Sequence, residues 1–198
     1  MRRALALAQA QLGRTSPNPA VGCVIVKDGA IIAEAATGDG GRPHAEEAAL
    51  HSLGGHADGA TAYVTLEPCG ERSNGGCACS QLLVQAGVKR VVFACEDPSP
   101  YASHIGTRRL AAAGIQVETG LMQSEAFGLI QGFVHYLNTG RPLVAESQTG
   151  EGFDARYEPA PLTEAAEDLK LWGERGFRRL WVERGSELAQ SLRQAGLL

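Results

Sequence analysis

Three residues of the sequence have the types and spacing that bind a transition metal. His44 lies at the expected start of a helix, Cys69 follows a proline after an expected strand, and Cys79 lies at the start of another expected helix. One imidazole and two thiolates fill three of the four tetrahedral positions of Zn²⁺ and leave the fourth for water, as in catalytic zinc sites. The sequence therefore predicts an open zinc site.

Cys77 is the alternative second thiolate. Counting back from Gly87, where the helix is expected to end, places Cys79 on the first helical turn and Cys77 in the preceding loop. We therefore favour Cys79 as the ligand. Cys23 and Cys95 lie in apolar strand patterns, where small buried cysteines are common, so we expect both in the core.

Glu46 is a carboxylate two residues after His44. Side chains at this spacing diverge in the first turn of a helix, so Glu46 is predicted to move protons rather than to bind the metal. Bound zinc lowers the pKa of water toward about 7. A carboxylate beside it can take a proton from that water and pass protons to departing ammonia. His-x-Glu followed by Pro-Cys is the pattern of zinc nucleobase deaminases, so we predict a hydrolytic deaminase with Glu46 as its catalytic residue.

Length and charge limit the other function classes. The 198 residues are 44% hydrophobic, which allows one ordinary domain with a small appendage. The net charge of −4 lacks the basic excess that nucleic-acid binding requires. No apolar run approaches the roughly 20 residues that cross a bilayer. We expect a soluble cytoplasmic protein with neither a nucleic-acid nor a membrane partner.

The hydrophobic pattern positions these residues on alternating strands and helices. Strands are expected at 21–26, 30–33, 62–66, 88–94 and 115–118, and helices at 1–12, 44–53, 81–86, 108–113 and 124–138. The pair Asp28-Gly29 predicts a tight hairpin between the first two strands. Such alternation predicts an α/β protein with a partly parallel sheet that helices cover on both faces.

The pattern changes after Pro142. Residues 147–161 are polar and aperiodic, as in a linker, and residues 162–198 read as helix, strand and helix. A unit this small is expected to lack a core of its own and to pack on the main domain, residues 1–146, or on a second subunit.

Residues 1–146 resemble the deaminase domain of the bifunctional riboflavin-biosynthesis deaminase-reductases. The resemblance rests on the segments at 15–23, 60–69 and 97–100 and on the long gap between Cys69 and Cys79. It implies a three-layer α/β/α cytidine-deaminase-like fold with a mixed central sheet and a small C-terminal α/β appendage. It also implies deamination of diaminohydroxyphosphoribosylaminopyrimidine, an aminopyrimidine carrying a ribosylamino 5′-phosphate, with release of ammonia.

The resemblance further implies a set of substrate contacts. Asn18 would hydrogen-bond the pyrimidine, and the Asp97 loop would help to enclose it. The full set is Asn18, Ala45, Glu67, Pro68, Glu71, Asp97 and His104. Asn18 and Asp97 have a structural alternative, because both residue types stabilise turns beside proline.

Two positions depart from the family pattern. Thr37 and Glu71 stand where the family usually has histidines near the substrate. A carboxylate near a phosphate repels it, so either Arg42, Arg72 or His104 compensates, or the substrate is not the usual phosphate ester.

Residues 162–198 resemble a remnant of the family's reductase domain. The family's lysine is absent near Ser147, and Arg184 replaces the second glycine of its cofactor turn. We expect no pyridine-nucleotide reduction and a role in packing or in a homodimer.

Two alternatives stay open. The chain could deaminate another heterocycle, such as a free base, a nucleoside or tRNA, although the lack of a basic stripe argues against tRNA. It could also be an inactive, zinc-stabilised binding protein. Glu46 argues against this alternative, because a structural zinc site needs no carboxylate beside it.

Overall fold

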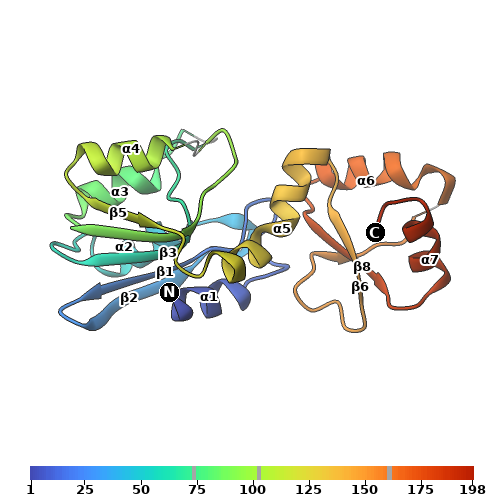
Figure 1. The fold of residues 1–198 in the computed structure, drawn as a ribbon, viewed down its shortest axis with the longest axis horizontal. Helices are drawn as coiled ribbons and strands as arrows, with labels where there is room; N and C mark the ends of the chain where they lie inside the picture. Colours follow the sequence, from blue (N-terminus) through green and yellow to red (C-terminus); the bar gives the residue numbers. More distant parts are fainter. Residues whose placement is uncertain (73–74, 102–103, 160–161) are drawn as a thin grey trace.

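A mixed five-stranded sheet forms the centre of the N-terminal domain (Figure 1). The computed structural model describes residues 1–72, 75–101, 104–159 and 162–198. The strand order is β2-β1-β3-β4-β5. The strands are β1 (Gly22–Lys27), β2 (Ala30–Ala36), β3 (Thr61–Leu66), β4 (Arg90–Cys95) and β5 (Gln116–Thr119). β1 pairs antiparallel with β2 and β3, whereas β3, β4 and β5 are parallel. The expected mixed sheet is confirmed.

The hairpin between β1 and β2 turns at the expected pair. Asp28 and Gly29 have φ values of 51° and 80°, which is the backbone twist of the tight turns that join antiparallel strands. Such a turn needs a residue that tolerates positive φ at both positions, and Asp-Gly meets this need.

Helices cover both faces of this sheet and make the expected three layers. α1 (Arg2–Gln9) and α5 (Gln123–Thr139) lie on one face, while α2 (Ala45–Ser52), α3 (Cys79–Gln85) and α4 (Ile105–Ala112) lie on the other. A short turn, η1 (Asp39–Gly41), precedes α2. The buried core between the layers includes Ile25, Val64, Leu83, Phe93 and Leu110. The layers bring the first turns of α2 and α3 to the same end of the sheet, beside the end of β3 (Figure 1).

The C-terminal residues form a second sheet with helices, which is the expected small α/β appendage, but part of the segment expected as a linker belongs to it. Its three parallel strands are β6 (Leu143–Ser147), β8 (Arg179–Glu183) and β7 (Ala155–Arg156), in that order. η2 (Leu162–Glu164), α6 (Ala165–Glu174) and α7 (Glu187–Gln194) accompany them. The first domain therefore ends before β6, and the segment at 147–161 contains a strand. β7 could not be predicted from the sequence, because two residues are too few to show the alternation of a strand.

This C-terminal unit has a core of its own, contrary to expectation. Its fully buried side chains include Tyr157, Leu169, Leu180 and Leu192. Tyr157 comes from the supposed linker and is the largest of them, and its hydroxyl donates to the Ala165 carbonyl at 3.2 Å. The extra strands from 143–156 supply the apolar surface that a helix-strand-helix unit lacks.

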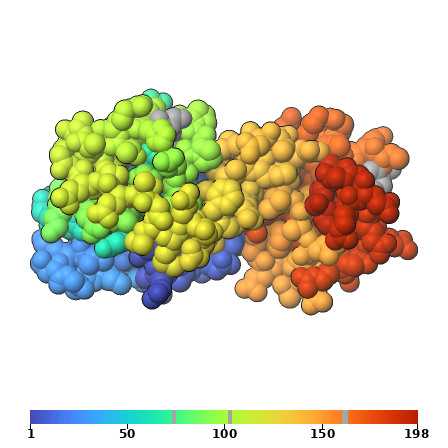
Figure 2. Space-filling model, in the orientation of Figure 1, coloured from blue at the N-terminus to red at the C-terminus, as the bar shows by residue number. Residues whose placement is uncertain are grey.

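The two lobes meet at α5 and at the loop before β1, where Figure 2 shows the surface of α5 running from one lobe to the other. The Ser16 hydroxyl donates to Asp154 at 2.7 Å, and Arg178 Nε donates to the Pro17 carbonyl at 3.1 Å. Gly132 of α5 leaves room for the second lobe, because a Cβ there would lie 2.4 Å from Arg179 Cγ. The C-terminal unit thus packs on the main domain of the same chain.

Across the described ranges, the helices are all too short or too polar to cross a bilayer.

Candidate active site

The structure brings His44, Cys69 and Cys79 together. Their candidate ligand atoms all lie within 4.8 Å of one another. His44 Nδ1 lies 3.8 Å from Cys69 Sγ and 3.4 Å from Cys79 Sγ. A sulfur and a nitrogen bound to one tetrahedral Zn²⁺, with bonds of about 2.3 and 2.0–2.1 Å, are about 3.6 Å apart. The spacing and the donor set therefore fit this ion.

The element boundaries explain this convergence. His44 is the N-cap of α2, and Cys79 is the first residue of α3. Cys69 lies in the loop that follows β3. Cys77 is exposed and outside the cluster, so the structure brings together the cysteine that counting back along the helix had favoured.

Hydrogen bonds from α3 and α4 hold the Cys69 loop. The Ser80 hydroxyl donates to the Cys69 carbonyl at 2.9 Å, and the Cys79 amide donates to Cys69 Sγ at 3.3 Å. Arg109 of α4 donates to Ser80 Oγ at 2.6 Å and to the Gly70 carbonyl at 2.7 Å. A Cβ at Gly106 would lie only 2.0 Å from the Pro68 carbonyl oxygen, so α4 packs directly against this loop.

The cluster favours a thiolate at Cys69. Hydrogen bonds from Cys79 and His44 lower the pKa of Cys69 to about 3, although burial opposes this shift. Thiolates, not thiols, bind metals, so Cys69 is prepared for a cation. The hydrogen bond to Cys69 and burial raise the pKa of Cys79, so this thiol would lose its proton when the cation binds.

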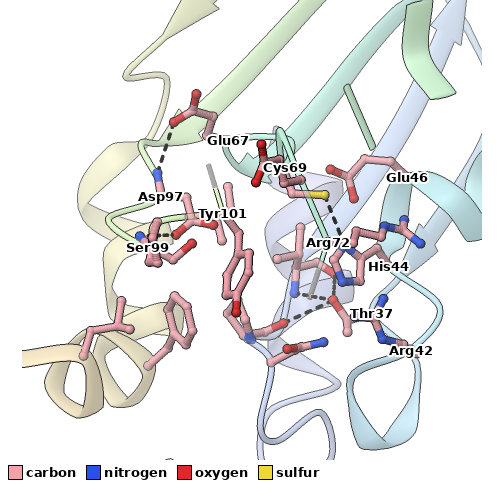
Figure 3. A pocket seen from close by; sticks show the side chains of 18 residues that line it. Thr37, Arg42, His44, Glu46, Glu67, Cys69, Arg72, Asp97, Ser99 and Tyr101 are labelled. Atoms are coloured by element: carbon pink, nitrogen blue, oxygen red, sulfur yellow. Dashed lines mark hydrogen bonds between the residues drawn. The ribbon is translucent and has the colours of Figure 1, made fainter. Parts of the chain in front are cut away.

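Glu46 lies in the same wall with only 4% of its surface exposed. Burial raises its pKa, and the negative charge of Cys69 adds to the effect. Figure 3 shows Glu46 beside Cys69 and His44. A carboxyl group whose pKa is moved toward neutral pH is suited to take up and release protons.

A cavity of about 220 Å³ opens onto His44, Glu46 and Cys69 (Figure 3). Of the expected substrate contacts, Asn18, Glu67, Glu71 and Asp97 line it. Ala45 is fully buried, and Pro68 is not part of the lining. His104 lines a neighbouring hollow instead. It is the N-cap of α4, with φ 60°.

Three of these lining residues hold the loops that surround the cavity. Glu67 accepts hydrogen bonds from the Thr107 hydroxyl at 2.6 Å and from the Asp97 amide at 3.4 Å. Asp97 in turn accepts from the Ser99 amide at 2.8 Å, and burial raises its pKa. Across the cavity, the Asn18 amide nitrogen donates to the Gly41 carbonyl at 2.9 Å. Asn18 and Asp97 therefore stabilise loops, as the structural alternative predicted, and they also line the cavity.

Thr37, which stands where the family usually has a histidine, is buried in the cavity wall. Its hydroxyl accepts from the Val21 amide at 3.0 Å and contacts the Pro19 carbonyl at 3.2 Å. The side chain thus fastens the start of β1.

The sequence reading missed several lining residues. Phe133 and Leu137 of α5 line the cavity, although their helical spacing predicts only core packing. Tyr101 lies across the cavity from Thr37 and Arg42 (Figure 3). No local pattern distinguishes these side chains, because their role depends on how α5 and the loop after β4 fold over the site.

Comparison with known proteins gives the same picture. Residues 1–95 match the family model of the cytidine and deoxycytidylate deaminase zinc-binding region. The chain is 48% identical over 156 residues to the riboflavin biosynthesis protein RibD of Escherichia coli, which covers 79% of this chain and 42% of that protein. It is 43% identical over 145 residues to the chloroplastic riboflavin biosynthesis protein PYRD of Arabidopsis thaliana, with 73% and 34% covered. The chain thus spans less than half the length of these curated relatives.

Solved structures share the fold over nearly the whole chain. A deaminase/reductase of Thermotoga maritima matches with a TM-score of 0.84 at 24% identity, over 98% of this chain and 82% of that one. RibD of Acinetobacter baumannii matches with a TM-score of 0.79 at 28% identity, over 100% and 83%. The fold and the donor set are those of the zinc-dependent hydrolytic deaminases. Within that class, the riboflavin-biosynthesis deaminases are the proteins that this chain resembles in sequence and in fold.

Proposed function

We propose that this chain hydrolytically deaminates diaminohydroxyphosphoribosylaminopyrimidine, the substrate after which the Thermotoga maritima relative is named. One water is consumed, the bond between a ring carbon and its amino nitrogen breaks, and ammonia leaves as a carbonyl forms. The observation that carries the proposal is the buried Glu46 in the wall of a cavity beside His44, Cys69 and Cys79.

The residues would divide the work as follows. His44, Cys69 and Cys79 would hold Zn²⁺, which when bound lowers the pKa of water toward about 7. Glu46 would accept a proton from the water and deliver protons to the leaving nitrogen. Asn18 and Asp97 would hold the ring against the cavity wall, and Glu67 would orient the Asp97 loop.

We extend the proposal to the rest of the chain. The C-terminal unit would pack on the deaminase domain and support a homodimer; Leu121 and Phe127, which are exposed next to and on α5, offer apolar surface for such a contact. A cytoplasmic location is proposed because zinc-binding thiolates need a reducing compartment. The substrate would be a small molecule.

The test is ammonia release by the zinc-loaded protein on the diaminopyrimidine phosphate. Turnover is expected with zinc, and loss of turnover is expected after chelation. Absence of ammonia from protein that contains zinc, under conditions in which a RibD relative is active, would reject this substrate. Cytidine and deoxycytidylate tested in parallel would show whether the chain acts on another heterocycle.

The second candidate function is zinc-stabilised binding without catalysis. It is favoured by one observation, that the Thr37 hydroxyl is committed to the backbone of β1 and its preceding loop. Binding of the pyrimidine to zinc-loaded protein without ammonia release would support this candidate.

A further inference from the structure

The cavity carries a positive charge whose role the catalytic proposal does not use. Arg42, Arg72 and His104 are the basic side chains that could balance Glu71 near a phosphate. His104 lines the neighbouring hollow and not the cavity, which leaves Arg42 and Arg72 as the candidates in the cavity wall.

Arg72 lines the cavity but is already engaged. Its Nη1 donates to Glu47 Oε2 at 2.9 Å and its Nη2 donates to Cys79 Sγ at 3.2 Å. Its side chain is 5% exposed. The carboxylate of Glu47 and the sulfur of Cys79 therefore neutralise it, and little attraction is left for an anion in the cavity.

Arg42 differs from Arg72 in its partners, because Arg72 engages both Nη1 and Nη2 and leaves only its buried Nε unpartnered. It lines the cavity, and its Nη1 is buried without a hydrogen-bond partner among the residues that the structure describes. A buried donor without a partner costs free energy, and a charged one costs more than a neutral one. The guanidinium is planar and presents paired donors that match a phosphate. Nη1 has almost no open surface in the cavity as the side chain lies, so a rotation of the guanidinium would bring it to an anionic group of the ligand and give it a partner.

The backbone fixes the position of Arg42. The Gly38 amide donates to the Pro43 carbonyl at 2.9 Å and so closes the loop that carries Arg42. In Figure 3, Arg42 lies on the same side of the cavity as Thr37 and His44, across from Asp97 and Tyr101. An anion on this side would leave the space next to Glu46 and Cys69 for the reacting ring.

We propose that Arg42 binds a phosphate monoester on the substrate, in a cavity where Thr37 and Glu71 stand in place of the family's usual histidines. This inference rests on the proposed function, because it assigns the substituent of the ring that occupies the same cavity. Arg42 is then a binding residue that determines specificity, and the chain prefers phosphorylated over unphosphorylated substrates.

The test measures binding apart from turnover, in a Glu46→Gln background. Calorimetry would give the dissociation constants of the diaminopyrimidine phosphate and of its dephosphorylated form. Adding Arg42→Gln is expected to weaken the phosphorylated form about 10- to 100-fold, as for loss of a hydrogen bond to a charged group, with little change for the other form. Arg42→Lys keeps the positive charge but not the paired guanidinium donors, so its dissociation constant for the phosphorylated form should lie between those of the proteins with Arg42 and with Arg42→Gln. Arg14→Gln, at an exposed arginine paired with Asp39 outside this cavity, should change neither.

A second probe separates this inference from the proposed function. Ribose 5-phosphate carries the phosphate without the ring, and its binding should also depend on Arg42. If this dependence is found while no ammonia is ever released, the proposed function fails and the phosphate site stands. Equal weakening of both pyrimidines by Arg42→Gln, no weakening of either, or no binding of ribose 5-phosphate to the Glu46→Gln protein would overturn the inference.

Discussion

Arg72 Nη2 lies 3.2 Å from Cys79 Sγ and donates a hydrogen bond to it, while Nη1 of the same guanidinium reaches Glu47. Two thiolates would cancel the charge of one Zn²⁺, so the metal site would not repel a nearby guanidinium. The buried Arg72 guanidinium against the Cys79 sulfur then stabilises the thiolate form of Cys79. Partners of this kind orient ligands and tune metal affinity.

Arg72→Gln is therefore expected to lower zinc affinity about 10- to 100-fold, the usual effect of removing such a partner. Competition with a chromophoric chelator measures it. Glu47→Gln is the matched variant, because it removes the anchor at 2.9 Å but leaves the donor to Cys79, and it should cost less. Equal zinc affinity in the Arg72→Gln and unaltered proteins would contradict the role of this contact.

The sequence predicted the metal cluster better than the cavity around it. Cys79 could be chosen by counting residues back from the expected helix end at Gly87, which places Cys79 in the first turn. The structure begins α3 at Cys79. The sequence offered Arg42 only as one of three basic candidates near the substrate, and Phe133 could not be assigned to the cavity, because it follows the site on a distant helix. His104, which the resemblance placed beside the substrate, lines a neighbouring hollow in the structure, and its contact with the substrate stays a prediction.

The C-terminal part shows the same limit. The helix-strand-helix order was readable because each element is several residues long. β7 has two residues, and its pairing with β8 depends on packing around Tyr157, which no local pattern announces.

Glu46→Gln is expected to keep zinc and to lose turnover about 100- to 10,000-fold, the usual contribution of a positioned proton carrier. The amide has the shape of the carboxyl group but cannot take a proton. Ammonia release and zinc content are measured on the same sample. Turnover within a few-fold of the unaltered protein would remove Glu46 from the proton-carrying role.

Replacing one cysteine at a time separates the two candidate thiolates. Cys79→Ser should strongly reduce the roughly one zinc per chain expected of a single tetrahedral site, whereas Cys77→Ser should keep it, because Cys77 is exposed and outside the cluster. Metal analysis after dialysis against a chelator gives both values. Loss of zinc in the Cys77→Ser protein would reverse the assignment.

Asp154 is expected to hold the two lobes together. Its Oδ2 accepts from the Ser16 hydroxyl at 2.7 Å and from the amides of Arg178 and Arg179 at 2.6 and 2.9 Å. Asp154→Ala leaves these donors without their partner and should lower the free energy of unfolding of the C-terminal unit by about 2 to 4 kcal/mol.

Fluorescence during urea unfolding follows this unit selectively, because the two tryptophans of the chain, Trp172 and Trp181, both lie in it. Asp154→Asn keeps one acceptor oxygen and should lose less. Unchanged midpoints for both variants would show that the contact contributes nothing to stability.

Asp97 gives a pH dependence of stability with a definite sign. Burial raises the pKa of Asp97 in the folded protein above the ordinary value of 3.8, which applies to the unfolded chain. At pH values between the unfolded and the folded pKa, the folded protein therefore binds more protons at this group than the unfolded chain does. Stability from this group therefore falls as pH rises through that window and is constant above it.

Asp97→Asn removes the titration but can still accept the hydrogen bond from the Ser99 amide. The free energy of unfolding of the variant, minus that of the unaltered protein, should rise from about pH 4 upward and then level off. Urea titrations of both proteins in the same buffers measure this difference, and other titrating groups cancel. A difference that falls with pH would mean that the Asp97 carboxylate is stabilised in the folded protein, and the raised pKa of this half-buried group would then be wrong.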